Sequence, residues 1–276
     1  MSYLKSIGYN VTYMKILVCI KAVPDPEQVI NSGGDTPEVH ADESTEMRLS
    51  RFDEFVVEES VLIKECYPES TIDAISVGPE AALKAVKRAM GMGADFGIHI
   101  VSDYQTACDA VSVSGYIAQI AAGKNYDLIL CGIMSEDMMQ FQVGPMLAQR
   151  MGLPWTTAVI HETVNLNEKM ISVERELEGG LSEMLDIRLP ALLTVQSGIN
   201  EPRYPSLSKI LRATDSVINT ISVKTLKPVK SPSRTIGYSF PEKKRDGLIL
   251  EGTSMEKAET LLRVLREKGF RYKAEV

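Results

Sequence analysis

The sequence predicts an α/β fold in which a mostly parallel, doubly wound sheet carries antiparallel additions at one edge and an extended C-terminal arm. Up to residue 151, short apolar runs typical of strands alternate with amphipathic segments typical of helices. From 156 to 195 the segments are β-rich without a clear helix. A stretch rich in Pro, Ser and basic residues, from 224 to 246, then precedes one last helix. We therefore expect a main domain over 14–222 and an arm over 223–276.

The strands of the first half are continuous apolar runs, as expected for parallel strands that are buried on both faces. Each helix repeats apolar residues along one face, as Leu83, Val86 and Met90 do before the stop at Gly91 and Gly93. The predicted order is strand 15–20, helix 52–65, strand 71–77, helix 80–90, strand 96–101, helix 103–122 capped near Ser102 or Asp103, strand 127–132 and helix 143–151.

The second half begins with β-rich segments at 158–160, 170–173, 184–188 and 191–195. Their alternation and the Gly179-Gly180 pair between them predict antiparallel additions to one sheet edge. The last helix has a capping box of Thr253 and Glu256 and ends at Gly269. Its apolar face consists of Ala258, Leu261, Leu262 and Leu265. Docking of that face on a partner subunit explains the long arm better than docking on the chain itself.

Composition excludes several classes of function. The net charge of −7, from 37 acidic and 30 basic residues, disfavours nucleic acid as a ligand. No apolar run approaches the roughly 20 residues that span a bilayer. The opening residues 1–5 lack the pattern of a signal peptide, so a cytoplasmic location is expected, with 1–13 as a dispensable leader before the strand that follows Met14.

Cysteine and histidine are too scattered to indicate a metal site. The four cysteines, Cys19, Cys66, Cys108 and Cys131, include no CxxC pair, and we expect buried, reduced thiols. His99 lies in an apolar strand pattern, where a hydrogen-bonded core histidine is the expected role. We find no nucleophile and base at a useful spacing, so no catalytic residue is predicted.

Two loops are candidates for ligand binding, because open parallel sheets bind ligands at the carboxyl ends of strands near the topological switch point. One is 21–26, after the first strand. The other is 132–145, which opens directly into a helix whose N-terminal amides would attract phosphate. The glycines of 32–36 indicate only a surface turn, since they lie beyond the strand and no helix follows at once.

Several separated blocks of the chain resemble the beta subunit of electron transfer flavoproteins from Met14 onward, and in the same order. They are residues 16–23, Phe52-Asp53-Glu54 with Val57-Glu58-Glu59, residues 92–95 with 97–99, Gln142-Val143-Gly144, the Glu-Gly-Gly run at 178–180, and residues 200–204. The resemblance implies an adenine nucleotide alpha hydrolase-like fold and a heterodimer with an alpha subunit that carries FAD. It also implies electron transfer from acyl-CoA dehydrogenase-type donors to a quinone oxidoreductase-type acceptor, as in fatty acid beta-oxidation.

The resemblance further implies that this subunit holds a structural AMP. Carried over residue by residue, its contacts are Cys19, Ser50, Arg51, Phe52, Asp53, Val77, Gly132, Ile133, Met134, Ser135, Glu136, Asp137, Met138, Met139, Gln140, Phe141, Gln142 and Val143. This chain has Ser50-Arg51-Phe52 where the family has Asn-Pro-Phe. It also has Met138 and Met139 in a run that is usually polar, so side-chain contacts do not carry over at those two positions.

Electron-bifurcating relatives hold a second FAD in place of AMP. Residues 21–25, Lys-Ala-Val-Pro-Asp, favour that branch, whereas 52–54 and 57–59 favour AMP, which we take as the expected ligand. A stand-alone adenine-nucleotide sensor is an alternative of another class, although a sensor needs no long arm.

The family's recognition loop corresponds to residues 200–215. Its anchoring leucine corresponds to Leu207, with Ile210, Leu211 and Tyr204 beside it as partner-binding residues. The lysine cluster that follows the loop in the family is reduced here to Arg212, which changes the expected partner surface. The alternative is that Leu207 belongs to the core.

Overall fold

The structure is a computed structural model that describes residues 13–27, 46–102, 109–232 and 247–270. These residues fall into two compact units. One contains the sheet and its helices, and the other contains the C-terminal helix α6. Each unit is described by itself.

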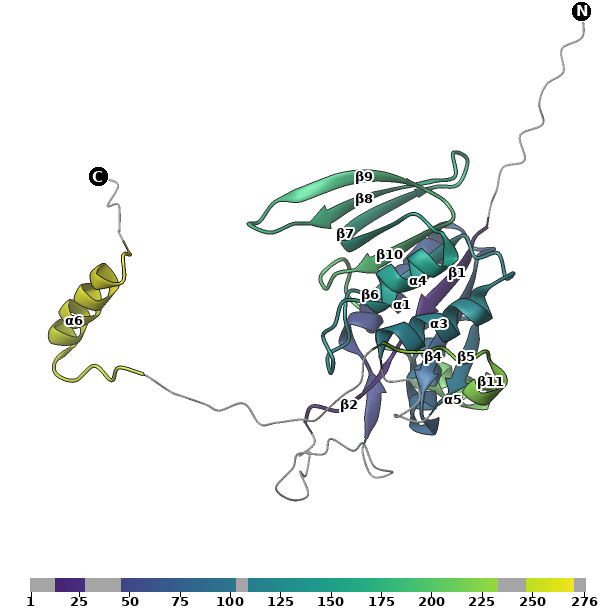
Figure 1. Ribbon diagram of the computed structural model, residues 1–276, viewed down its shortest axis with the longest axis horizontal. Coiled ribbons are helices and arrows are strands. Elements are labelled where there is room, and N and C mark those ends of the chain that lie inside the picture. Colours follow the sequence, from purple (N-terminus) through teal and green to yellow (C-terminus); the bar gives the residue numbers. More distant parts are fainter. Residues whose placement is uncertain (1–12, 28–45, 103–108, 233–246, 271–276) are drawn as a thin grey trace, which may run out of the picture. The chain divides into compact units, whose positions relative to one another are not determined.

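The main sheet has the strand order β11-β5-β4-β1-β6-β10-β7-β8-β9 in the described part of the chain (Figure 1). Its strands are β1 (Lys15–Cys19), β4 (Thr71–Gly78), β5 (Phe96–Val101), β6 (Leu128–Gly132), β7 (Trp155–Asn165), β8 (Met170–Glu176), β9 (Ser182–Arg188), β10 (Ala191–Val195) and β11 (Asn219–Ser222). Pairing is parallel from β11 through to β7. The β7–β8 and β8–β9 pairs are antiparallel. The predicted fold class is therefore confirmed.

Helices cover both faces of this sheet. They are α1 (Arg51–Cys66), α2 (Leu83–Met92, after a 3-10 turn at Glu80–Ala82), α3 (Ala110–Ala121), α4 (Val143–Met151) and α5 (Leu207–Asp215). Residues of α1 and α2 pack with Ile16 and Val18 of β1 on one face. Residues of α3 and α4 pack with Leu17 and Cys19 on the other. Because alternate residues of β1 enter two different cores, all four residues after Lys15 are apolar.

Most of the predicted elements of the first half are confirmed, but the helix predicted at 103–122 begins later. Its first residue is Ala110, and Asp109 is the N-cap, with Oδ1 accepting from the backbone N–H groups of Val111 at 2.9 Å and Ser112 at 3.1 Å. The predicted cap at Ser102 or Asp103 is thus wrong, because an acidic side chain nearer the apolar repeat satisfies the first amides. Residues 103–108 lie outside the described chain.

The prediction that 191–195 is an antiparallel edge strand is also wrong. All five residues of β10 are buried, and the strand lies parallel between β6 and β7. The other β-rich segments do form the antiparallel edge. Gly179 and Gly180 adopt positive φ in the turn between β8 and β9, where a side chain would be strained.

Four further elements were not predicted. The recognition segment 200–215 contains helix α5, β11 extends the far edge of the sheet beside β5, and β2 (Ala22–Pro24) pairs with β3 (Met47–Leu49). A nine-residue helix without a side-chain cap has little local signal, because short helices depend on packing for their stability.

Helix α6 (Ser254–Glu267) follows its prediction closely. The capping box forms: Thr253 N–H donates to Glu256 Oε2 at 2.7 Å, and Glu256 N–H donates to Thr253 Oγ1 at 3.4 Å. Its predicted apolar face, including Leu261, Leu262 and Leu265, is exposed in the described chain. No helix among the described residues is long and apolar enough to cross a membrane.

The cysteines and His99 lie in environments that agree only in part with the predictions. Cys19 and Cys131 are buried as expected, but Cys66 is exposed at the end of α1, so that part of the prediction is wrong. His99 is buried with Nε2 at 3.2 Å from the carbonyl oxygen of Gly78, which confirms a hydrogen-bonded core histidine. Cys108 and the glycine turn at 32–36 lie outside the described residues.

Candidate functional site

The candidate site lies at the carboxyl ends of β1 and β6, which are neighbours in the sheet. Strands β4 and β5, which come after β1 in the sequence, lie on one side of the β1–β6 pair. Strands β7 and β10, which come after β6, lie on the other side. The strand order therefore reverses between β1 and β6, which is where open parallel sheets bind ligands. The loops at 20–25 and 133–142 leave the sheet at this point.

Asp53, in the first turn of α1, forms the buried centre of the site. Its Oδ2 accepts the backbone N–H of Lys21 at 2.7 Å, and its carboxylate also accepts the backbone N–H of Gly132. Burial raises the pKa of Asp53 to about 8, against the lowering effect of those hydrogen bonds and of the Lys21 charge. One side chain thereby connects the ends of both strands to the start of α1.

Two ion pairs fasten the loop 133–142 over this edge. Lys21 Nζ lies 2.6 Å from Asp137 Oδ2, and Arg48 of β3 donates to Glu136 Oε1 at 3.0 Å. Glu136 Oε2 also accepts the backbone N–H of Arg51 at 3.0 Å, at the N-terminus of α1. Burial alone would raise the pKa of Asp137, but the charge and hydrogen bond of Lys21 hold it below its ordinary value. The loop thus carries the negative charges that compensate both cations.

The outer part of the loop is exposed and sharply turned. Met138, Met139 and Phe141 are exposed, and Met139 and Phe141 adopt left-handed backbone conformations with φ of 48° and 58°. Such conformations cost non-glycine residues about 1 kcal/mol or more each. The loop backbone is therefore held in a specific shape just before α4 begins.

A buried hydroxyl at this edge lacks a partner. Ser50, the N-cap residue of α1, is fully buried, and its Oγ makes no hydrogen bond to any other described residue. Buried polar atoms are nearly always hydrogen-bonded, so this hydroxyl beside Asp53 could bond a ligand group at this edge.

The structure brings the sequence-predicted nucleotide residues together. Residues 50–53 are the N-cap and first residues of α1, and residues 132–143 run from the end of β6 to the start of α4. Cys19 ends β1, and Val77 is the residue before the last one of β4. The thiol of Cys19, however, belongs to the core that α3 and α4 cover. A hydrogen bond with Cys131 and burial raise its pKa, so it is an inert thiol. Sequence reasoning missed Arg48, because nothing local connects β3 with Glu136, 88 residues away.

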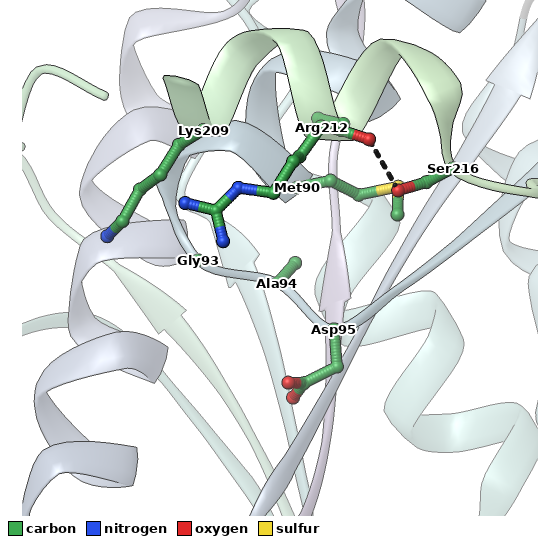
Figure 2. A pocket seen from close by; sticks show the side chains of 8 residues that line it. Met90, Gly93, Ala94, Asp95, Lys209, Arg212 and Ser216 are labelled. Carbon is green, nitrogen blue, oxygen red and sulfur yellow. Dashed lines mark hydrogen bonds between the residues drawn. The ribbon is translucent and has the colours of Figure 1, made fainter. Parts of the chain in front are cut away.

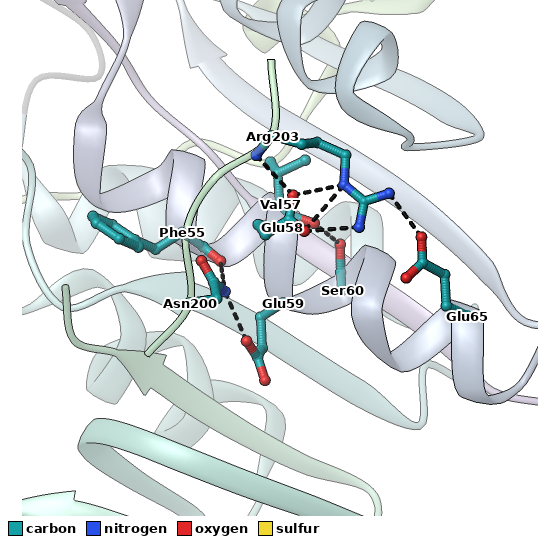
Figure 3. A network of polar contacts seen from close by, with 8 residues as sticks. All are labelled: Phe55, Val57, Glu58, Glu59, Ser60, Glu65, Asn200 and Arg203. Atoms are coloured by element: carbon teal, nitrogen blue, oxygen red, sulfur yellow. Dashed lines mark hydrogen bonds and ion pairs between the residues drawn. The ribbon is translucent and has the colours of Figure 1, made fainter. Parts of the chain in front are cut away.

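A second polar network holds the segment 200–206, which we call the strap, against α1 (Figure 3). Arg203 donates to Glu58 from Nε at 2.8 and 3.0 Å and from a terminal nitrogen at 2.8 Å. The other terminal nitrogen of Arg203 lies 2.7 Å from Glu65. Asn200 Nδ2 donates to the carbonyl oxygen of Phe55 at 3.0 Å and to Glu59 at 2.7 Å.

A second carboxylic acid adjoins the Asn200 end of this network. Burial, together with the charge and hydrogen bond of Glu59, raises the pKa of Glu162 on β7 to about 8. Burial also raises the pKa of Glu59, and the hydrogen bond from Asn200 only partly offsets this. Two carboxyl groups this close resist ionising together, which favours a proton shared between them.

The predicted partner-binding residues lie at the end of the strap and in α5 and are exposed, which makes the core alternative for Leu207 wrong. Tyr204 is 90% exposed, Leu207 72%, Leu211 58% and Ile210 38%. The guanidinium of Arg88 lies 5.5 Å from the ring centre of Tyr204. Exposed apolar side chains that gather on one segment mark an interaction surface.

A pocket of about 220 Å³ lies between α5 and the end of α2 (Figure 2). Lys209, Arg212 and Ser216 line it from α5 and its end, and Met90 and Asp95 line it from α2 and the turn before β5. Ser216 Oγ donates to the carbonyl oxygen of Arg212 at 2.8 Å, which closes the end of the helix. The surface around α5 therefore combines apolar side chains with two cations.

Comparison with known proteins points to one family. A profile described as Electron transfer flavoprotein domain matches residues 39–226. The chain is 31% identical over 263 residues to electron transfer flavoprotein subunit beta of Bacillus subtilis, covering 93% of this chain and 99% of that protein. It is 32% identical over 259 residues to the Bos taurus subunit beta, covering 93% and 98% of the two chains. It is 30% identical over 238 residues to the mitochondrial subunit beta of Arabidopsis thaliana, covering 86% and 93%.

Proposed function

This chain belongs to the electron transfer flavoprotein family as a beta subunit, and from that premise we propose that it binds a structural AMP at the β1–β6 edge. We further propose that it pairs with an alpha subunit that carries most of the flavin, and that the heterodimer relays electrons between flavoenzymes. The orphaned hydroxyl of Ser50 beside buried Asp53 is the observation on which the AMP proposal rests.

The residues at this edge fit an adenylate. The shaped loop before α4 would present backbone amides to a phosphate, and Ser50 would supply a hydroxyl, whereas the first amide of α1, that of Arg51, is already bonded to Glu136. Lys21 and Arg48 are already paired with Asp137 and Glu136. Because those pairs fasten the loop over the site, a compact nucleotide that remains bound fits better than one that exchanges. The nucleotide's role would be structural, since no acid–base work is required of these residues.

Electron exchange with partner enzymes requires a docking surface, which we assign to Leu207, Leu211 and Tyr204. Exposed apolar anchors on a short helix suit a transient redox complex, whose interface is small. The proposed donor is an acyl-CoA dehydrogenase-type enzyme, and the acceptor is a quinone oxidoreductase-type enzyme. The arm 223–276 would dock on the alpha subunit through the exposed apolar face of α6.

Nucleotide extraction tests the ligand. The complex, co-expressed with its alpha subunit and denatured in acid, is expected to release one FAD and one AMP per heterodimer. Two FAD molecules and no AMP would contradict the proposal. They would favour the electron-bifurcating alternative, which residues 21–25 resemble. Ser50→Ala should lower AMP content without changing FAD content. A stable monomer that binds AMP without any partner would instead favour the adenine-nucleotide sensor.

Substitution of the anchor tests docking. Leu207→Ala should slow flavin reduction by an acyl-CoA dehydrogenase that has been charged with its acyl-CoA, while FAD and AMP content stay unchanged. Val217→Ala is the matched control, because Val217 is also an exposed apolar residue but lies beyond the end of α5. Equal reduction rates in the two variants would remove α5 from the docking surface. A cytoplasmic location stays a prediction.

A further inference from the structure

The strap connects β10 to α5 by passing over α1, and two side chains anchor it there. Asn200 and Arg203 contact Phe55, Glu58 and Glu59 on successive turns of one face of α1 (Figure 3). The anchors therefore hold the chain just before the residues that lead into α5.

The Arg203–Glu58 contact is unusually complete. Glu58 is only 3% exposed, and it accepts three bonds from the guanidinium and a fourth, at 3.0 Å, from the backbone N–H of Arg203. A buried carboxylate needs such full pairing, and removing its partner leaves an uncompensated charge. The planar fork of arginine also fixes the direction of the contact, which lysine does not do.

Helix α5 lies along α2 but buries few of its own side chains. Among its residues in the described chain, Ala213 alone is buried. Helix α2 lies against α5. A Cβ built on Gly91 of α2 would lie 3.6 Å from Cβ of Pro205, in the strap, and 3.7 Å from Ile210 of α5. Because so few side chains of α5 are buried, we expect its orientation to depend on the strap as well as on α2.

We propose that Arg203 and Glu58 are positioning residues for partner docking: they hold the strap on α1 and so orient the exposed Leu207–Leu211 face of α5. Neither residue needs to touch the partner. The inference rests on the proposed docking role of α5, but the order of α5 can be measured without any partner. The two ideas are therefore separable by experiment.

The first measurement is hydrogen exchange over 207–215 in the flavin-loaded complex. Arg203→Met removes both the positive charge and the planar guanidinium, and Arg203→Lys keeps only the positive charge. Arg150→Met is the control. Arg150 contacts α3 on the opposite face of the sheet, with hydrogen bonds to Ser114 and Val111. Exchange should rise about tenfold in Arg203→Met and less in Arg203→Lys, without change in the control. Unchanged exchange in Arg203→Met would overturn the proposal.

The second measurement is steady-state reduction by an acyl-CoA dehydrogenase at varied concentration. Arg203→Met should raise KM for the dehydrogenase about tenfold with kcat nearly unchanged, and Arg203→Lys should recover part of the loss. FAD and AMP content should equal those of the control. Looser exchange with an unchanged KM would overturn the positioning role. If Arg203→Met does not fold, Glu58→Gln, which keeps the shape and removes the charge, takes its place with the same expected results.

Failure of this inference differs from failure of the docking proposal. If Leu207→Ala leaves KM unchanged, α5 does not dock the partner, whatever its exchange rate. If Leu207→Ala raises KM while Arg203→Met changes neither KM nor exchange, docking stands and the positioning role falls.

Discussion

Asp53 occupies the space that a side chain on Gly132 would need. A Cβ built on Gly132 would lie 2.4 Å from Oδ1 of Asp53, well inside van der Waals contact. Gly132 ends β6, and Asp53 lies in the first turn of α1. The close approach of strand end and helix start at the candidate nucleotide site therefore requires glycine at this position.

Gly132→Ala should displace Asp53 or the strand end and so lower the AMP content of the co-purified complex. Gly247→Ala is the control, because a Cβ there meets open space and the backbone conformation needs no glycine. AMP released by acid is the quantity to measure. Equal AMP content in both variants would contradict the assignment of this edge as the nucleotide site.

Asp53 should make nucleotide retention depend on pH. With a pKa of about 8, its carboxyl is largely neutral below pH 8 and becomes a buried negative charge above it. A buried anion next to a phosphate is unfavourable, so AMP retention should fall as the pH rises through about 8. Asp53→Asn cannot ionise and should retain AMP equally at pH 7 and pH 9 in a dialysis assay. A pH dependence identical to that of the native protein would exclude Asp53 as its source.

The acid pair beside the strap should make folding stability depend on pH. Glu162 has a folded pKa of about 8 against an ordinary 4.5, so between these values the folded chain holds a proton that the unfolded chain has lost. Stability therefore falls as the pH rises from about 4.5 to 8 and levels off above. Glu162→Gln should flatten part of this decline and stabilise the chain by about 1–3 kcal/mol at pH 8.

Thermal unfolding of the complex at several pH values measures this effect. Glu168→Gln, on an exposed turn beyond the same strand, is the control and should follow the native curve. Asp53 titrates over a similar range, so some pH dependence should persist in Glu162→Gln. A curve that matches the native one throughout would mean that Glu59 and Glu162 do not share a proton.

The apolar face of α6 should be required for assembly. Replacing Leu261 and Leu265 together by alanine removes two exposed leucines, while Glu259→Ala with Arg263→Ala changes two exposed polar residues of the same helix. Pull-down of the alpha subunit should weaken at least tenfold in the first variant and persist in the second, since apolar anchors dominate such interfaces. Retention of the alpha subunit by both variants would place the interface elsewhere.

The sequence alone determined the alternation of strands and helices, because strands buried on both faces are apolar at most positions. Residues 15–20, 96–101 and 127–132 carry that requirement locally. It also named residues 21–26 and 132–145 as candidate ligand loops, because each follows a strand of a parallel sheet, and the ligand site there stays a prediction. The capping box at Thr253 is equally local, and its four residues sufficed to predict where α6 begins.

Tertiary structure alone decided which distant residues meet. Arg203 and Glu58 are 145 residues apart, Arg48 and Glu136 are 88 apart, and no local pattern pairs them. The place of β10 between β6 and β7, and the existence of α5, likewise depend on which surfaces each segment buries. The spacing of apolar residues along one segment indicates that one of its faces is buried. The partner that buries it is chosen by the packing of the whole chain, because burial and charge pairing act on residues that folding brings together.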